Sequence, residues 1–212
     1  FNRALQGTYP PGSTFKLLNG LIALQEGAIR KSTTFICKGG YDYEDEKKLG
    51  CHCQSKSPLN LTGAIEISCN AYFCNTFEKY FRGFNSSILA YDNWHAHLSS
   101  FGIGDYLNND FINGSPGKLP PYSYYNTLYK GSWNANTIIS MAIGQGELLL
   151  TPIQMANMTS ILANRGYYYT PHIIKEITGG EIDSNFTLKK YCSIEEKYFE
   201  PIIRVNQHCH FV

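Results

Sequence analysis

A tight turn that runs directly into an apolar helix is the feature that most constrains this chain. Residues 10–12, Pro-Pro-Gly, can fix a bend, and the run Ser13-Thr14-Phe15-Lys16 follows it without a break. Apolar side chains then recur at the three-to-four-residue spacing of a helix that buries one face: Phe15, Leu18, Leu21 and Ile22. The sequence therefore predicts a helix that begins at this turn, ends near Gly27 and packs into a core.

The first turn of this helix carries a candidate nucleophile. Ser13 and Lys16 are one turn apart, so their side chains point the same way. A hydroxyl is a weak nucleophile at neutral pH, and a lysine that burial drives toward its neutral form is a suitable base for it. The N–H groups at the helix start also favour a developing oxyanion. The pattern indicates an activated serine, although a bare Ser-x-x-Lys is common and needs a second motif.

The second motif is Ser68-Cys69-Asn70, which follows a short helix predicted over residues 59–67. A bend at this point would direct Ser68 and Asn70 toward one place. Serine acyl-transfer enzymes that carry Ser-x-x-Lys use such a motif for a proton-relay hydroxyl and a substrate-holding amide.

With Gly144-Gln145-Gly146-Glu147 and the following Thr151-Pro152, these motifs resemble the class B penicillin-binding proteins, the peptidoglycan D,D-transpeptidases. Within that family the chain is most similar to the elongation-type penicillin-binding protein 2 group, over most of residues 1–175. The resemblance implies an α+β fold of the transpeptidase and serine β-lactamase type. We expect a helical cluster against an antiparallel sheet, incomplete at both ends.

The resemblance also implies a mechanism. Ser13 would attack the D-alanyl-D-alanine carbonyl of a peptidoglycan stem peptide while Lys16 takes its proton, and penicillins and other β-lactams would acylate the same serine. Ser68 would relay the proton to Lys16, and Asn70 would orient the acyl donor. Wall-elongation membrane proteins are the implied partners, in a process that sets cell shape.

The family's third motif, Lys-Thr-Gly or Lys-Ser-Gly, does not occur in this sequence. We therefore expect residues 1–203 to be a partial transpeptidase domain and residues 204–212 to be a tail unlike the family, such as a truncated or frame-shifted end. The start at Phe1 carries no membrane anchor. The resemblance implies that the intact protein sits in the cell inner membrane and faces the periplasm.

Composition and charge narrow the classes of partner. Hydrophobic residues make up 43% of the chain and charged residues 17%, which suits one globular domain with a core. A net charge of +1, with lysines and arginines scattered, gives no footprint for nucleic acid or acidic lipid.

The remaining chain is predicted to be mostly helical. Residues 71–82 place four aromatic residues on one face, and Ser86-Ser87 can cap a helix through Leu98. Residues 105–135 are expected to form a long loop, and Thr151 to cap a helix that stops at Gly166. Residues 165–192 alternate apolar and polar positions and suggest strand pieces around a hairpin.

Seven cysteines raise a separate question, and their odd number gives no obvious disulfide pairing. Some relatives of this family hold a structural zinc beside the active site, and the matching positions here are Cys37, Cys51, Cys53 and Cys69, with His52 as an alternative ligand. Four thiolates would close a tetrahedral site, so such a zinc would brace the loop and take no part in catalysis. Disulfides and free buried thiols remain the alternatives.

Two alternative kinds of function remain open from the sequence alone. The same first two motifs occur in serine β-lactamases and β-lactam sensors, which differ in how fast the acyl-enzyme hydrolyses. Without the third motif, the chain could also be a catalytically incomplete fragment or a non-catalytic, zinc-braced remnant.

Overall fold

The computed structural model describes residues 1–44, 47–111 and 113–206. Its helices are α1 (Arg3–Gln6), α2 (Lys16–Gln25), α3 (Leu61–Glu66), α4 (Asn70–Arg82), α5 (Ser87–Ser100), α6 (Tyr122–Leu128), α7 (Pro152–Ala163), α8 (Ser184–Thr187) and α9 (Glu200–Asn206). The strands are β1 (Gly40–Glu44), β2 (Lys47–Gly50), β3 (Tyr167–Tyr168) and β4 (Lys190–Tyr191). Short 3-10 turns are η1 (Gly12–Phe15), η2 (Gln54–Lys56), η3 (Ile139–Ile143) and η4 (Glu196–Tyr198).

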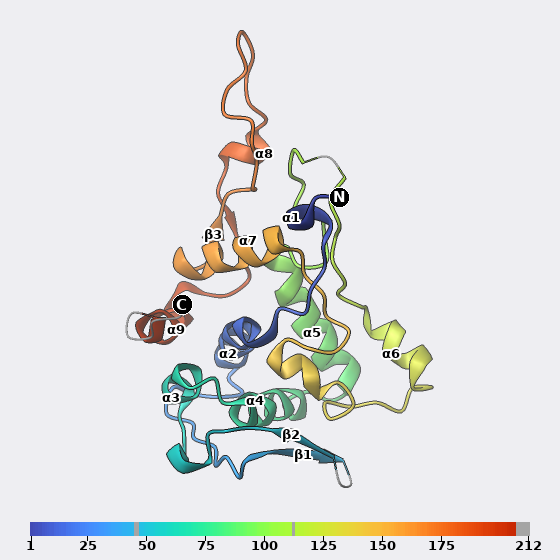
Figure 1. Cartoon of the computed structure of the whole chain (residues 1–212), viewed down its shortest axis with the longest axis vertical. Coiled ribbons are helices and arrows are strands. Elements are labelled where there is room, and N and C mark those ends of the chain that lie inside the picture. Colours follow the sequence, from blue (N-terminus) through green and yellow to red (C-terminus); the bar gives the residue numbers. More distant parts are fainter. Residues whose placement is uncertain (45–46, 112, 207–212) are drawn as a thin grey trace.

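Helix α2 is the centre of the fold and packs against α4, α5 and η3 (Figure 1). The predicted apolar face is buried, with Phe15, Leu18 and Leu21 all 0% exposed. Asn19 is a buried polar residue of α2. Its amide donates to the carbonyl oxygens of Met141 and Ala142, and its oxygen accepts from the Trp94 indole. Because buried polar groups need partners, this side chain fixes η3 and α5 against the central helix.

The helices begin where their capping residues stand. Ser86 accepts from the backbone N–H of Leu89 at the start of α5. Thr151 forms a reciprocal capping box with Gln154 at the start of α7. The aromatic face predicted for residues 71–82 is buried in α4: Phe73, Phe77, Tyr80 and Phe81. The helix predictions in these regions are therefore confirmed.

Two regions differ from the sequence predictions. Helix α6 lies inside the stretch predicted to be a long loop, because Tyr125 is buried against the rings of Tyr91 and Trp133 and these contacts stabilise a turn of helix that the local composition does not favour. The antiparallel hairpin of β1 and β2 was not anticipated. Its segment is polar and short, and it lies along α4 at the base of the view in Figure 1.

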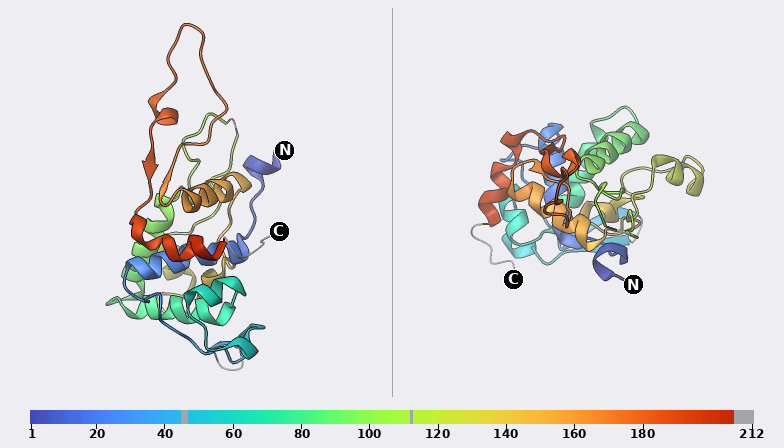
Figure 2. Two further views of the ribbon diagram at one scale, coloured as in Figure 1. Left: turned by 90° about the vertical axis from the view of Figure 1, so that its left-hand side faces the viewer. Right: turned by 90° about the horizontal axis from the view of Figure 1, so that it is seen from above.

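The predicted strand pieces of residues 165–192 are confirmed only in part. Strands β3 and β4 pair antiparallel, but each is two residues long. The chain between them, residues 169–189, leaves the body as a projecting arm (Figures 1 and 2). The Asp110 carboxylate accepts hydrogen bonds from the backbone N–H groups of Ile173 and Ile174, so these amides are used by a side chain and not by a third strand.

The expected tail of residues 204–212 lies mostly outside the described residues. Residues 204–206 continue α9, and residues 207–212 are not described. Within the described part of the chain, no helix is both long enough and apolar enough to span a bilayer.

Candidate active site

The structure brings the four predicted catalytic residues together around one amine. The Lys16 Nζ lies 3.1 Å from Ser13 Oγ, 2.9 Å from Ser68 Oγ and 2.6 Å from Asn70 Oδ1. It also donates to the Ser68 carbonyl oxygen at 2.9 Å. Residues that are 52 and 54 positions apart from Lys16 in sequence thus converge on it.

The turn before α2 presents Ser13 at the surface. Gly12 has φ +60°, and its N–H donates to the Gly144 carbonyl oxygen at 2.9 Å. Gly144 itself has φ +71°, and a side chain there would collide with Gly12 and Phe15. The Gly144-Gln145-Gly146 segment therefore needs glycine at its first position, because the backbone of the nucleophile turn lies directly against it.

The side chains of the Ser68-Cys69-Asn70 bend point in different directions. Ser68 has φ +54°, a left-handed conformation that costs a non-glycine residue free energy and is often found at functional sites. Ser68 and Asn70 face Lys16, whereas Cys69 turns inward, is 1% exposed and caps α4 through its sulfur.

One contributor to this site has no signal in the sequence. The Asn70 side-chain N–H₂ donates to the Gly50 carbonyl oxygen at 2.9 Å. This bond leaves the Asn70 amide oxygen facing Lys16. Because the acceptor is a backbone group at the end of β2, no residue type could have marked it in advance.

Burial shifts the Lys16 amine toward its neutral form. Lys16 is 2% exposed, and none of the ion pairs among the described residues includes it. Burial lowers the pKa of its amine, while the neighbouring cysteines, Cys51 first among them, act in the opposite direction. A lysine with a lowered pKa beside two hydroxyls can accept a proton from either of them.

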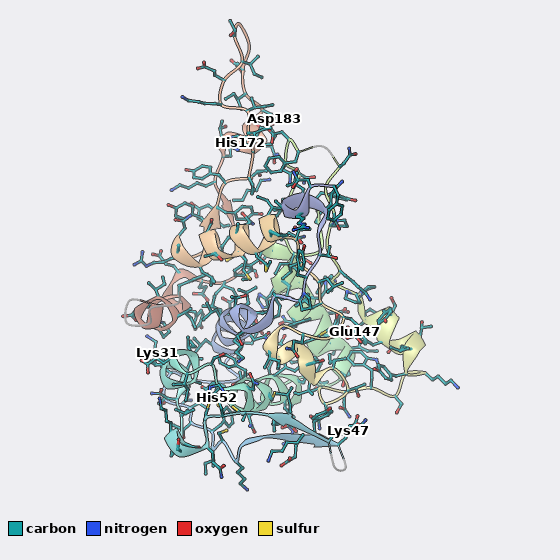
Figure 3. The ribbon with its side chains drawn as sticks, in the orientation of Figure 1. Lys31, Lys47, His52, Glu147, His172 and Asp183 are labelled. Carbon is teal, nitrogen blue, oxygen red and sulfur yellow. The ribbon has the colours of Figure 1, made fainter. Side chains whose placement is uncertain are left out.

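A cluster of thiols lies on the other side of the Ser68-Cys69-Asn70 bend. The sulfurs of Cys37, Cys51 and Cys69 lie within 4.8 Å of one another. Cys51 Sγ is 3.6 Å from Cys69 Sγ and 3.5 Å from Cys53 Sγ. Cys53 is not part of the three-sulfur group, and the exposed His52, labelled in Figure 3, is not part of it either.

The six described cysteines are free thiols, and Cys209 lies outside the described residues. Burial opposes ionisation of Cys51, but hydrogen bonds from the Ala71 and Cys53 backbone and from the neighbouring thiols lower its pKa to about 6. Burial and the hydrogen bond with Cys51 raise the pKa of Cys53 to about 11. One member of the cluster is thus poised to be a thiolate.

Two of the sulfur–sulfur separations suit a tetrahedral zinc ion. A zinc–sulfur bond of about 2.3 Å places neighbouring sulfurs of a tetrahedral site roughly 3.8 Å apart. The separations of 3.5 and 3.6 Å are close to that value. Cys37, Cys51 and Cys69 could share a cation as they stand, whereas Cys53, which contacts Cys51 but lies outside that group, would have to move to become a fourth ligand.

A buried lysine between two serines and an asparagine is the kind of site that serine acyl-transfer enzymes carry. The family described as the penicillin binding protein transpeptidase domain matches residues 1–201, and the chain belongs to it.

Curated relatives narrow the resemblance. The chain is 30% identical over 188 residues to the peptidoglycan D,D-transpeptidase MrdA of Acinetobacter baumannii, covering 85% of this chain and 26% of that protein. It is 32% identical over 180 residues to MrdA of Escherichia coli, covering 82% of this chain and 26% of that protein. The chain therefore spans about a quarter of the length of these relatives.

Two solved structures support the same family assignment. Pseudomonas aeruginosa PBP2 in complex with WCK 5153 is 27% identical, with a TM-score of 0.81 over 98% of this chain and 46% of that one. PBP2 of Helicobacter pylori, in its complex with MreC, is 25% identical, with a TM-score of 0.77 over 100% of this chain and 37% of that one. These matches confirm the predicted fold class and the likeness to the penicillin-binding protein 2 group.

Proposed function

We propose that this domain performs the acyl-serine chemistry of a peptidoglycan D,D-transpeptidase. The observation that carries the proposal is the single buried amine of Lys16, which contacts Ser13 Oγ, Ser68 Oγ and the Asn70 amide oxygen at once. Membership of the transpeptidase family and the names of the curated relatives support it.

In the proposed reaction, Ser13 Oγ attacks the D-alanyl-D-alanine carbonyl of a stem peptide and Lys16 accepts its proton. D-alanine leaves, and the acyl group stays on Ser13. The Ser68 hydroxyl, 2.9 Å from the same amine, then passes a proton between Lys16 and the incoming amine of a second stem peptide. Asn70 orients the acyl donor through its amide. A β-lactam would acylate Ser13 by the same first step.

The names of two solved neighbours support a proposal about partners. The Helicobacter pylori neighbour is a complex with MreC, and the Pseudomonas aeruginosa neighbour is a complex with WCK 5153. We accordingly propose that the intact protein acts with wall-elongation membrane proteins at the periplasmic face of the inner membrane.

The proposal includes a structural zinc. Cys37, Cys51, Cys53 and Cys69 would hold it, with no ligand position open to substrate. Such an ion supplies a fixed point beneath the loop and no chemistry of its own. Cys69 would transmit this restraint to Ser68 and Asn70, its neighbours on either side.

The test is intact-mass spectrometry of the chain after incubation with a penicillin, beside the Ser13→Ala variant. We expect a persistent adduct that requires Ser13. Rapid loss of the adduct would point to a β-lactamase, and formation without turnover of stem peptides to a β-lactam sensor. If the folded chain forms no adduct, it is a catalytically incomplete fragment, because the sequence contains no Lys-Thr-Gly or Lys-Ser-Gly strand.

A further inference from the structure

A second serine, away from Lys16, is hydrogen-bonded to a histidine that is itself held by a carboxylate. His97 Nδ1 lies 2.6 Å from Ser193 Oγ, and His97 Nε2 lies 2.9 Å from Glu26 Oε1. Glu26 caps α2, His97 belongs to α5, and Ser193 follows β4. The three residues thus come from three separate parts of the sequence.

The surroundings hold this arrangement in place. His97 is 6% exposed, whereas Ser193 is an exposed residue. Gln25, beside Glu26, donates to the Ser193 carbonyl oxygen at 2.7 Å and accepts from the Glu195 N–H at 2.7 Å. A fixed backbone, a buried imidazole and an exposed serine are three of the features that activate a serine nucleophile.

The hydrogen-bond partners of His97 indicate which ring nitrogen carries its proton. The Ser100 hydroxyl lies 2.6 Å from the His97 carbonyl oxygen, to which it donates, and it accepts from the Ser193 N–H at 3.0 Å. The carboxylate of Glu26 accepts only, so the neutral His97 places its proton on Nε2. His97 Nδ1 is then an acceptor, and the closest donor to it is the Ser193 hydroxyl. Ser100 Oγ, 2.9 Å from Ser193 Oγ, is a competing acceptor, and the shorter contact of 2.6 Å to His97 Nδ1 favours transfer of the Ser193 proton to the base.

We propose that Ser193 is a second nucleophilic serine of this domain and a site of covalent modification by small acyl or organophosphorus electrophiles. The Ser193 Oγ forms a bond to the carbonyl carbon or the phosphorus, and its proton passes to His97 Nδ1. The bond to the leaving group breaks, and an alkoxide leaving group takes the proton back from His97. Glu26 positions the imidazole and stabilises its charged form.

The two ring nitrogens are used in the reverse order from the serine protease template, in which Nε2 faces the serine. Either nitrogen can take the proton once a carboxylate holds the other, because that bond fixes the tautomer. The proposal is independent of the transpeptidase assignment, since none of these residues contacts Lys16 or Ser13 by any hydrogen bond among the described residues.

The experiment uses the full 212-residue chain carrying Ser13→Ala, so that the first nucleophile is silent. The chain is incubated with an alkyl fluorophosphonate, and adducts are located by intact mass and peptide mapping. We expect one adduct, on Ser193, and none in the Ser13→Ala/Ser193→Ala variant. His97→Gln should slow labelling at least about 100-fold, the usual contribution of a positioned general base.

Two controls separate reactivity from structure. Ser132 is exposed and lies outside this cluster, so its labelling in the same peptide map measures ordinary serine reactivity. Circular dichroism and melting curves report whether His97→Gln stays folded. If it does not, Glu26→Gln tests the same relay, with an expected slowing of up to about 10,000-fold, as for the same exchange in the serine protease template. Labelling of Ser193 no faster than Ser132, or labelling unchanged in a folded relay variant, would overturn the proposal.

Discussion

Two polar clusters meet at the Ser68-Cys69-Asn70 bend, and they are opposites. On one side, oxygen atoms surround the buried amine of Lys16, and no carboxylate among the described residues pairs with it. On the other, the sulfur atoms of Cys37, Cys51 and Cys69 lie within 4.8 Å of one another. The first environment favours loss of a proton, and the second favours capture of a positive ion. Because successive side chains of the bend point to opposite sides, Ser68 and Asn70 face the amine while Cys69 faces the other thiols.

The largest effect is expected where the amine is removed. Lys16→Met keeps the length and apolar stem of the side chain but has no proton acceptor. We expect penicillin acylation of Ser13 to fall by about 1000-fold, or roughly 4 kcal/mol in the barrier. The measurement is the rate of adduct formation by mass spectrometry, with the melting temperature as a control for folding. A loss below about 10-fold would mean that Lys16 is not the base.

Loss of the thiol cluster should act on stability first. With zinc bound, Cys69→Ser or treatment with a chelator should lower the free energy of unfolding by about 3 kcal/mol, which corresponds to a melting temperature lower by roughly 6–12 °C for a chain of this size. Differential scanning calorimetry and metal analysis test this together. Cys74→Ser is the matched control, since Cys74 is buried but is not in the three-sulfur group. A chain that binds no zinc while fully folded would contradict the brace.

Asn70→Ala should separate orientation from proton transfer. The variant keeps Lys16 and both serines but removes the amide that bonds to Gly50 and to the amine. We expect acylation to slow by about 10-fold, or roughly 1.4 kcal/mol in the barrier, which is the net contribution of a typical hydrogen bond. The zinc content should stay the same, since Cys69 is unchanged, and a fall in zinc content would show that the two clusters are not separable.

The pH dependence of the acylation rate tests Lys16 without a substitution, and its expected effect is the smallest. The neutral amine is the base, and the neutral form is populated above the pKa. Since burial lowers that pKa from 10.5, the acylation rate should rise with pH and level off below 10.5. A rate that is flat over roughly pH 6 to 10 would show that no group titrating there controls acylation.

The two clusters also differ in how far the sequence could predict them. Ser13 and Lys16 share a helical face, so their contact follows from local periodicity, and the apolar spacing after them predicted the burial of α2. The placement of the thiols could be proposed only from matching positions in relatives. Cys37 and Cys69 lie on either side of a hairpin that the sequence did not predict.

Other differences have the same origin. The helix α6 depends on Tyr125 reaching the rings of Tyr91 and Trp133, a tertiary contact that local composition does not contain. The arm alternates apolar and polar residues as a strand would, but Asp110 occupies the backbone amides of Ile173 and Ile174. The local sequence pattern predicted elements whose contacts are close in sequence. It failed where a side chain distant in sequence determines the local structure.

The backbone bonds that fix the nucleophile turn join residues far apart in the chain. Tyr9 exchanges two hydrogen bonds with Leu150, and the Gly12 N–H donates to the Gly144 carbonyl oxygen. During synthesis at roughly 5–20 residues per second, Ser13 would emerge about 6–25 s before the chain that completes its pocket. Ser13 is thus made well before Gly144 and Leu150, whose backbone groups hold its turn, so a nascent chain carries the serine for seconds before that turn is fixed.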